Sequence, residues 1–433
     1  MKLLVRGGRI VDPGQDLDAK CDLLAEDGIV TRIEESIDPK ALKGKKGEVE
    51  IFEAGGLVVT PGLIDVHVHL REPGEEYKET VKSGTMAAAA GGFTAVAAMP
   101  NTKPVNDNRS VTEFIRSEAR RWGFARVYPI GAVSKGMEGE ELAEIGDMVA
   151  GGAVAVSDDG LPVANTELMR RALLYAQHFD IPVVQHAEDL DLARGGVMHE
   201  GEWSTRLGLP GIPGAAEDVM VSRDIALAAD TGGRYHVAHL STRRSLDLVR
   251  KARAEGLRVT AEVTPHHLML SDEDVARSNF STHTKMKPPL RSAADRDALV
   301  NGLADGSIDA IASDHAPHHQ DEKDVEFSLA PFGVIGLETT VPVLLERLVR
   351  PGIVSLARFV AALTIGPARA FGLPGGTLAV GSAADLTLIA LDRQITIRAE
   401  RFHSKSRNTP FEGWKCRGRP AGTILAGKVV SLP

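Results

Sequence analysis

The middle of the chain contains eight short apolar runs separated by segments with the spacing of amphipathic helices. The runs occupy residues 63–70, 93–100, 126–133, 153–159, 181–187, 235–241, 258–267 and 308–317. Uniformly apolar strands that alternate with helices are typical of parallel strands buried on both faces. Eight such units predict a TIM-type (β/α)8 barrel over residues 60–373. A doubly wound parallel sheet is the competing architecture, and the helix after the third run has the weakest pattern.

Both ends of the chain follow a different pattern, with short strands and tight turns. The pair Asp27-Gly28, between apolar residues, indicates a hairpin, and Gly7-Gly8 indicates another turn near the N-terminus. The C-terminal part repeats this style around Gly427-Lys428. Neither end is large enough to enclose a core alone. We therefore expect residues 1–59 and 374–433 to pair into one small β-sandwich.

Charge and cysteine content argue against several classes of protein. The net charge is −9 and no basic cluster is visible, so the chain lacks the pattern of a nucleic-acid binder. Two distant cysteines, Cys21 and Cys416, form neither a disulfide framework nor a metal motif, and they fit the reducing cytoplasm. Residues 83–102 are uncharged and as long as a membrane span, but Gly91-Gly92 interrupts them and leucine and isoleucine are absent. We expect a cytoplasmic enzyme that binds neither nucleic acid nor membranes.

Polar side chains gather where the apolar runs end. They are His67, His69, Asp158, Asp159, His186, His239 and Asp314. In a barrel these strand ends open onto one face, so the side chains would converge. Taken singly, a histidine is often an ordinary buried polar residue, and an Asp-Asp-Gly sequence is often a turn. Four imidazoles and two carboxylates together, however, are costly to bury without a cation, and this mixture suits zinc or a similar divalent ion.

Three motifs make the chain similar to a known family. Residues 61–74, PGLIDVHVHLREPG, resemble the opening signature of cyclic amidohydrolases. Residues 99–104, MPNTKP, are similar to the substrate-binding turn of dihydroorotases, and residues 312–318, ASDHAPH, to their second signature. The resemblance extends over essentially the whole chain and is to the longer bacterial dihydroorotases. It implies the reversible cyclisation of N-carbamoyl-L-aspartate to L-dihydroorotate in pyrimidine biosynthesis, with a metal-activated hydroxide.

The resemblance also implies a centre with two zinc ions per subunit. His67, His69 and Asp314 would hold one ion, His186 and His239 the other, and Asp159 would bridge the two. Asp314 would also carry a proton from the hydroxide to the leaving nitrogen, and a role as ligand alone is the alternative. Many relatives use a carboxylated lysine as the bridge, but the strand over residues 152–160 contains no lysine. Since neighbouring strand residues face opposite sides, only one of Asp158 and Asp159 can face the metals, and the resemblance favours Asp159.

A set of substrate-binding residues follows from the same resemblance. The set is His69, Leu70, Arg71, Asn101, Lys287, His318, Phe332 and Gly333. Arg71 would pair with the substrate carboxylate, completed by Asn101 and His318, although an ordinary surface salt bridge is its alternative. Lys287 departs from the family pattern, because asparagine often stands at its place in the motif MKPPLR, and we expect it near the pocket. Residues 319–328 would form a mobile loop at the mouth or a plain solvated loop.

Other functions remain open at this point. The chain can instead be another cyclic amidohydrolase, an allantoinase or a dihydropyrimidinase. The carboxylate clamp argues against dihydropyrimidinase, whereas allantoinase is harder to exclude. A catalytically inactive homologue that scaffolds aspartate carbamoyltransferase is a third possibility, but every ligand position is filled. The resemblance implies a homodimer acting on a small molecule, and it leaves open an association with aspartate carbamoyltransferase.

Overall fold

The eight apolar runs form the predicted parallel barrel. The computed structural model describes residues 2–42 and 49–432, and the barrel strands follow the order β15-β14-β13-β10-β9-β8-β7-β6. They are β6 (Leu63–Val68), β7 (Phe93–Ala98), β8 (Arg126–Gly131), β9 (Ala155–Ser157), β10 (Val183–Gln185), β13 (Tyr235–Val237), β14 (Val259–Val263) and β15 (Ala310–Ile311). Val68 pairs in parallel with His315, and the amide of His69 donates to the His315 carbonyl at 2.9 Å. These contacts join the first strand to the last, which excludes the open doubly wound sheet.

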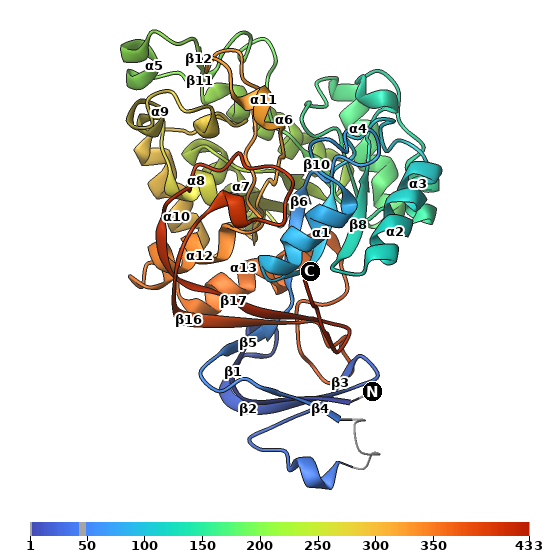
Figure 1. The fold of residues 1–433 in the computed structure, drawn as a ribbon. Coiled ribbons are helices and arrows are strands. Elements are labelled where there is room, and N and C mark those ends of the chain that lie inside the picture. The colour runs from blue at the N-terminus through green and yellow to red at the C-terminus, as the bar shows by residue number, and fades with distance from the viewer. Residues whose placement is uncertain (1, 43–48, 433) are drawn as a thin grey trace.

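Helices surround the barrel (Figure 1). They are α1 (Val81–Ala90), α2 (Arg109–Trp122), α3 (Ile145–Gly151), α4 (Thr166–Ala176), α6 (Ala215–Thr231), α7 (Arg243–Ala254), α10 (Ala293–Asp305) and α13 (Leu356–Leu363). The helix after the third strand, α3, has only seven residues, which explains its weak sequence pattern. Residues 83–102 contribute to α1, the Gly91-Gly92 turn and β7, as expected. Within the described residues no helix is long and apolar enough to cross a membrane.

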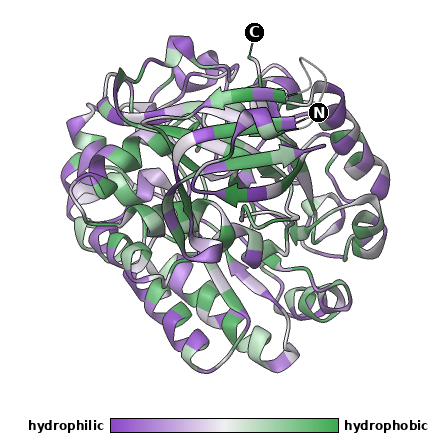
Figure 2. Ribbon diagram, turned by 90° about the horizontal axis from the view of Figure 1, so that it is seen from below, coloured by the Kyte–Doolittle hydropathy of each residue, from purple (hydrophilic) through white to green (hydrophobic). Residues whose placement is uncertain are grey.

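Short elements fill the loops between these units. They are α5 (Glu202–Leu207), α8 (Pro265–Met269), α9 (Glu273–Arg277), α11 (Gln320–Lys323), α12 (Thr340–Leu344), α14 (Ile365–Phe371) and the pair β11–β12 (Met198–His199 and Gly211–Ile212). Local sequence explains where the longer helices begin. The side chain of Asn108 accepts from the amides of Ser110 and Val111 at the start of α2. Hydrophilic and hydrophobic residues recur in turn along the outer helices, as in amphipathic helices that cover a core (Figure 2).

The two ends of the chain form one composite β-unit, as predicted. Its strands make a mixed eight-stranded sheet below the barrel (Figure 1). They are β1 (Lys2–Asp12), β2 (Leu17–Glu26), β3 (Ile29–Glu34), β4 (Val49–Glu53), β5 (Val58–Pro61), β16 (Leu386–Thr396), β17 (Lys415–Leu425) and β18 (Lys428–Val429). Strand β5 pairs antiparallel with β16, and Leu3, Val59 and Leu388 share one buried apolar cluster. The expected division at residues 59/60 and 373/374 stays a prediction.

The expected turn at Gly7-Gly8 is wrong, because β1 continues through it. The pairing of β1 with β2 shifts register between Val5 and Gly8, so Arg6 and Gly7 form a bulge, and Gly8 pairs again with Cys21. A Cβ atom on Gly8 would lie 2.5 Å from a methyl carbon of Val59, so the close approach of β5 requires glycine. Strand β1 pairs with β4 before the bulge and with β5 after it. Glycine pairs suit both a turn and a bulge. Only the pairing of β1 with its neighbouring strand distinguishes the two.

Candidate metal centre and pocket

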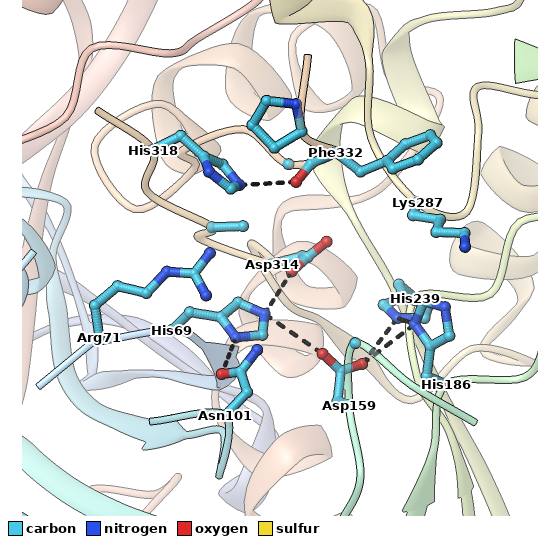
Figure 3. Close-up of a pocket in the computed structure, with 14 residues that line it drawn as sticks. His69, Arg71, Asn101, Asp159, His186, His239, Lys287, Asp314, His318 and Phe332 are labelled. Carbon is cyan, nitrogen blue, oxygen red and sulfur yellow. Dashed lines mark hydrogen bonds and ion pairs between the residues drawn. The ribbon is translucent and has the colours of Figure 1, made fainter. Parts of the chain in front are cut away.

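The six expected ligands converge at the carboxyl ends of the barrel strands, and five of them are drawn in Figure 3. They are His67, His69, Asp159, His186, His239 and Asp314, and all are buried. Two overlapping groups have donor atoms close enough to hold a cation. One consists of His67, His69 and Asp314, and the other of His67, Asp159 and His239. The site therefore has the chemistry of an imidazole and carboxylate centre for a divalent ion.

Asp159 lies between two pairs of imidazoles. Its Oδ2 atom is 3.3 Å from Nε2 of His67 and 3.5 Å from Nε2 of His69. Its Oδ1 atom is 3.1 Å from Nε2 of His239 and 3.4 Å from Nδ1 of His186. Each carboxylate oxygen thus faces its own pair, which is the arrangement of a bridging ligand.

Asp158 faces away from this centre. Its carboxylate accepts hydrogen bonds from the amides of Val133 at 2.8 Å and Ser134 at 3.0 Å, and from the Ser134 hydroxyl at 2.5 Å. The alternation of neighbouring residues after β9 therefore separates the two carboxylates, as the strand pattern predicts. Asp158 fixes the loop after β8, while Asp159 is free to face the histidines.

Glu262, near the carboxyl end of β14, orients one of the histidines from behind. Its Oε1 atom is 2.6 Å from Nδ1 of His67, and its Oε2 atom is 3.1 Å from Nε2 of His236. Burial raises the pKa of Glu262, but the charges of His67 and His236 outweigh it and lower that pKa to about 2. A carboxylate that binds Nδ1–H leaves the lone pair of Nε2 toward the centre. Sequence reasoning missed Glu262, although a carboxylate inside an apolar run was a signal.

Asn101 orients His69 in the same way. Its side-chain oxygen lies 2.8 Å from Nδ1 of His69, so Nδ1 donates and Nε2 carries the lone pair. Burial lowers the pKa of His69, which favours the neutral ring. In the neutral ring, Nε2 would point its lone pair at Asp314 Oδ1, 3.2 Å away, and at Asp159 Oδ2. A cation between these atoms would relieve that repulsion.

Further electrostatic observations support a cation at this place. Burial lowers the pKa of His67, but the charges of Asp159 and Glu262 outweigh it and raise that pKa well above its usual range. Burial raises the pKa of Asp314, but the His69 hydrogen bond and the His67 charge outweigh it and lower that pKa. The buried Nε2 of His67 still makes no hydrogen bond. The residues present therefore fit a divalent cation.

Three residues of the site have strained backbone conformations. Arg71, His239 and Asp314 have φ angles of 63°, 31° and 45°, in a region that side chains other than glycine adopt rarely. Such conformations cost free energy and persist where the surrounding structure enforces them, commonly at functional sites. The strain marks the ends of β6, β13 and β15 as the functional face of the barrel.

A cavity of about 380 Å³ opens beside the donors, with Arg71 and His318 on one side and Lys287 on the other (Figure 3). The expected substrate-binding residues that line it are His69, Arg71, Asn101, Lys287, His318, Phe332 and Gly333. The side chain of Leu70 does not reach the cavity. It is 2% exposed and packs in the core, where a Cβ atom on Gly84 would lie 2.5 Å from its Cδ2. Leu70 turns away because its neighbour His69 faces the site.

Arg71 is a buried cation at the wall of this cavity. Its side chain donates from Nε to the carbonyl of Pro317 at 3.2 Å, and the residue is 8% exposed. Among residues 2–42 and 49–432, no carboxylate oxygen lies within 4.0 Å of the guanidinium. Burial lowers the pKa of Arg71, but a guanidinium stays charged at neutral pH. The surface salt bridge is therefore excluded, and the guanidinium is available to an anion in the cavity.

Lys287 and Phe332 form the opposite side of the cavity. The ammonium of Lys287 is 2.6 Å from the carboxylate of Glu188 and 5.3 Å from the ring centre of Phe332. The ring is also 4.6 Å from the ammonium of Lys285. His318 donates from Nε2 to the Phe332 carbonyl at 2.8 Å. This side of the cavity is thus held together by charge and by backbone hydrogen bonds.

Comparisons with known proteins agree with this geometry. A family profile described as Dihydro-orotase-like matches residues 56–245. A curated dihydroorotase from Anaeromyxobacter sp. (strain K) is 54% identical, over 99% of this chain and 97% of that protein. Another, from Acetivibrio thermocellus, is 48% identical over 99% of this chain and 98% of its own.

Solved structures with the same architecture include hydantoinases. An L-hydantoinase from Arthrobacter aurescens has a TM-score of 0.88 at 27% identity, covering 99% of this chain and 96% of that one. A D-hydantoinase from Thermus sp. has a TM-score of 0.82 at 28% identity, covering 99% and 94%. The fold is thus common to several cyclic amidohydrolases, whereas the sequence identity is highest to the curated dihydroorotases.

Proposed function

Because the chain belongs to the dihydroorotase family, we propose that it interconverts L-dihydroorotate and N-carbamoyl-L-aspartate, a step of de novo pyrimidine biosynthesis. The observation that carries this proposal is the pairing of two features in one cavity. Asp159 turns one oxygen to each of two imidazole pairs, and the unpaired guanidinium of Arg71 lies across the cavity from it. The first feature serves amide hydrolysis, and the second recognises a substrate that carries a carboxylate.

The proposed centre holds two zinc ions per subunit. His67, His69 and Asp314 would bind one ion, His186 and His239 the other, and Asp159 both. Such a pair of ions supplies an activated water and polarises the amide carbonyl. The chain itself orients the donors, because Glu262 holds Nδ1 of His67 and Asn101 holds Nδ1 of His69. Asp158 maintains the loop that presents Asp159.

Asp314 is the proposed proton carrier. One of its oxygens faces Nε2 of His69, and the other points away from the imidazoles (Figure 3). An aspartate is ionised at neutral pH, so this free oxygen can accept the proton of the attacking water. In hydrolysis it then protonates the departing ring nitrogen, and in cyclisation the proton moves in the reverse direction.

The proposed substrate clamp comprises Arg71, Asn101 and His318. A guanidinium pairs with a carboxylate through two parallel hydrogen bonds, which fixes both its position and its orientation. The oxygen of Asn101 is bound to His69, so its amide nitrogen is the group left for substrate. The backbone of Phe332 and Gly333 would contact the ring, and Lys287 the part of the ring remote from the carboxylate. Hydantoins and dihydropyrimidines carry no carboxylate and would leave Arg71 unpaired.

The test of this function compares substrates on one preparation of metal-loaded protein. Hydrolysis of L-dihydroorotate, dihydrouracil, hydantoin and allantoin would be measured together with metal content. We expect kcat/KM for dihydroorotate to exceed the others by at least about 100-fold, the loss from leaving one buried charge unpaired. Faster turnover of allantoin or hydantoin would replace this assignment by another cyclic amidohydrolase. Full metal content with no turnover would favour the inactive scaffold.

We also propose a homodimer in the cytoplasm, with aspartate carbamoyltransferase as a partner. The support is the family resemblance, together with the composition of an acidic protein with two distant cysteines. Light scattering of the purified protein, alone and mixed with aspartate carbamoyltransferase from the same cells, tests both. A monomer at micromolar concentration, or no shift on mixing, would contradict the respective part.

A further inference from the structure

The roof of the cavity is a three-residue segment, Pro331–Gly333, whose Phe332 lies across the cavity from Asp159 (Figure 3). Each of its three carbonyl groups accepts a hydrogen bond from a different side chain. Lys323 donates to the carbonyl of Pro331 at 2.7 Å, and His318 donates to that of Phe332 at 2.8 Å. Asn408 donates to the carbonyl of Gly333 at 3.1 Å. The roof is thus held from two separate parts of the chain, residues 318–323 and Asn408.

Lys323 is the unusual member of these three. It ends the short helix α11, it is only 4% exposed, and its ammonium binds three backbone carbonyls. Besides Pro331, these are the carbonyls of Thr282 at 3.1 Å and Lys285 at 3.4 Å. In the described part of the chain, no carboxylate lies within 4.0 Å of this ammonium. The three donors of the ammonium therefore match three acceptors, and two distant segments meet at one charge.

The surroundings make this ammonium expensive to bury. Burial and the neighbouring charge of Lys285 lower the pKa of Lys323 to about 7, against the opposing charge of Glu322. Hydrogen bonds from three carbonyls favour the charged form, which donates three times where the amine donates twice. An apolar residue here would leave the Pro331 carbonyl without a donor, whereas the carbonyls of Thr282 and Lys285 would keep only the backbone amides of Lys285 and Gly333. Burial of this ammonium thus costs free energy, and its hydrogen bonds fix the backbone around it.

Two further hydrogen bonds connect Lys323 and its partners to the roof. The hydroxyl of Thr282 donates to the carbonyl of Lys323 at 2.6 Å, so the two residues bind each other in both directions. The amide of Gly333 donates to the carbonyl of Lys285 at 3.0 Å, the same oxygen that Lys323 binds. Without the ammonium, the carbonyl of Pro331 would lose its donor. The carbonyl of Lys285, which accepts from the Gly333 amide, would lose one of its two donors.

We propose that Lys323 is a positioning residue for substrate: its ammonium fixes Pro331–Gly333 at the height at which this backbone receives the substrate ring. The inference rests on the proposed function, in which the roof contacts the ring. Lys323 does not line the cavity and touches no substrate. Its effect is on the fraction of molecules whose roof is ready to bind, so it changes KM and leaves the chemical step unchanged.

The test uses Lys323→Met, which keeps the length of the side chain and removes its donors. If the ready fraction falls to a tenth, KM for dihydroorotate rises about 10-fold while kcat stays within about 2-fold. Metal content should not change. Lys323→Arg, which keeps a buried donor, should recover part of the KM. Thr282→Val removes only the reciprocal bond and should give a smaller rise, which serves if the methionine variant does not fold.

A matched control and an activity-independent readout complete the experiment. Lys82→Met removes a half-buried lysine of α1, whose ammonium lies 4.2 Å from the ring centre of Trp122 at the end of α2, and it should leave KM unchanged. Hydrogen exchange of the Gly333 amide should be faster in Lys323→Met than in the wild type or the control. Exchange at the wild-type rate would overturn the inference, as would equal losses of kcat, metal and thermal stability. If the wild type does not hydrolyse dihydroorotate, the proposed function fails, and the exchange measurement still decides the role of Lys323.

Discussion

At the scale of single residues, the site depends on where each polar atom finds its partner. Asp158 and Asp159 are neighbours of the same type, yet one serves the backbone of Val133 and Ser134 and the other faces four imidazoles. Strand alternation predicts that only one of the pair faces the metals, but not which one. The sequence could mark the titratable residues at the strand ends. It could not reveal the orienting hydrogen bonds of Glu262, because these join strands that are far apart in the chain.

Arg71→Ala tests the carboxylate clamp. The loss of a charge-assisted pair should cost about 1.5–3 kcal/mol, so kcat/KM for dihydroorotate should fall roughly 10- to 150-fold, mainly through KM. Bound metal should stay unchanged, since Arg71 is not a proposed ligand, and elemental analysis of the same sample checks this. Wild-type kinetics in the variant would mean that the carboxylate is recognised elsewhere.

Asp314→Asn tests the proton carrier. An amide cannot accept the proton, so turnover should be lost even in protein that still contains metal. Rate and metal content therefore have to be measured on one preparation, with Asp224→Asn, a buried carboxylate outside the proposed ligand set, as the control. An Asp314→Asn protein with near-normal activity would remove this residue from the mechanism.

Lys287 tests the departure from the family motif. Its ammonium lies at the cavity wall and is paired with Glu188, so it can donate a hydrogen bond where an asparagine amide would. Lys287→Asn should keep most of kcat/KM, whereas Lys287→Met should lose about 10-fold, the value of one hydrogen bond. Equal kinetics for the methionine variant and the wild type would place Lys287 outside the substrate contacts.

At the scale of elements, the order and type of the barrel strands could be predicted, because a buried parallel strand is apolar along its whole length. The bulge at Arg6-Gly7 could not be distinguished from a turn, since it is recognised only from the pairing of β1 with β2. The apolar run over residues 258–267 predicted strand β14, but it did not predict the function of the carboxylate inside this strand. Its sequence, VTAEV, interrupts an apolar run with Glu262, and such an interruption is itself evidence of a partner.

Glu262→Gln tests whether β14 supports the metal centre. The amide lacks the charge that holds Nδ1–H of His67, and the loss of such an orienting partner should weaken metal binding by about 10- to 100-fold. Competition with a chelator measures this affinity. Asp224→Asn, at a buried carboxylate that binds Gln185 and Arg223 instead, is the control and should keep its metal. Unchanged affinity in Glu262→Gln would show that His67 is oriented without it.

At the scale of the whole molecule, the C-terminal segment does more than complete the β-unit. Between β16 and β17 the chain returns to the barrel, where Ser404 donates to Glu79 at 2.5 Å and Asn408 binds the carbonyls of Ala316 and Gly333. Glu79 in turn lies 3.2 Å from the ring of His315, next to Asp314. Composition and periodicity could assign this segment to the terminal unit. They could not show that it reaches the cavity roof, because that contact depends on tertiary packing alone.

The central claim is a centre for two metal ions that is bridged by Asp159 and hydrolyses dihydroorotate. Metal-free protein, prepared and assayed without carbon dioxide or bicarbonate, would be titrated with zinc while dihydroorotate hydrolysis is followed. Activity should rise and level off at about two equivalents of metal per chain, and bicarbonate should add nothing, because the bridge is a carboxylate of the chain. No hydrolysis at any metal content, or activity that requires bicarbonate, would contradict the claim.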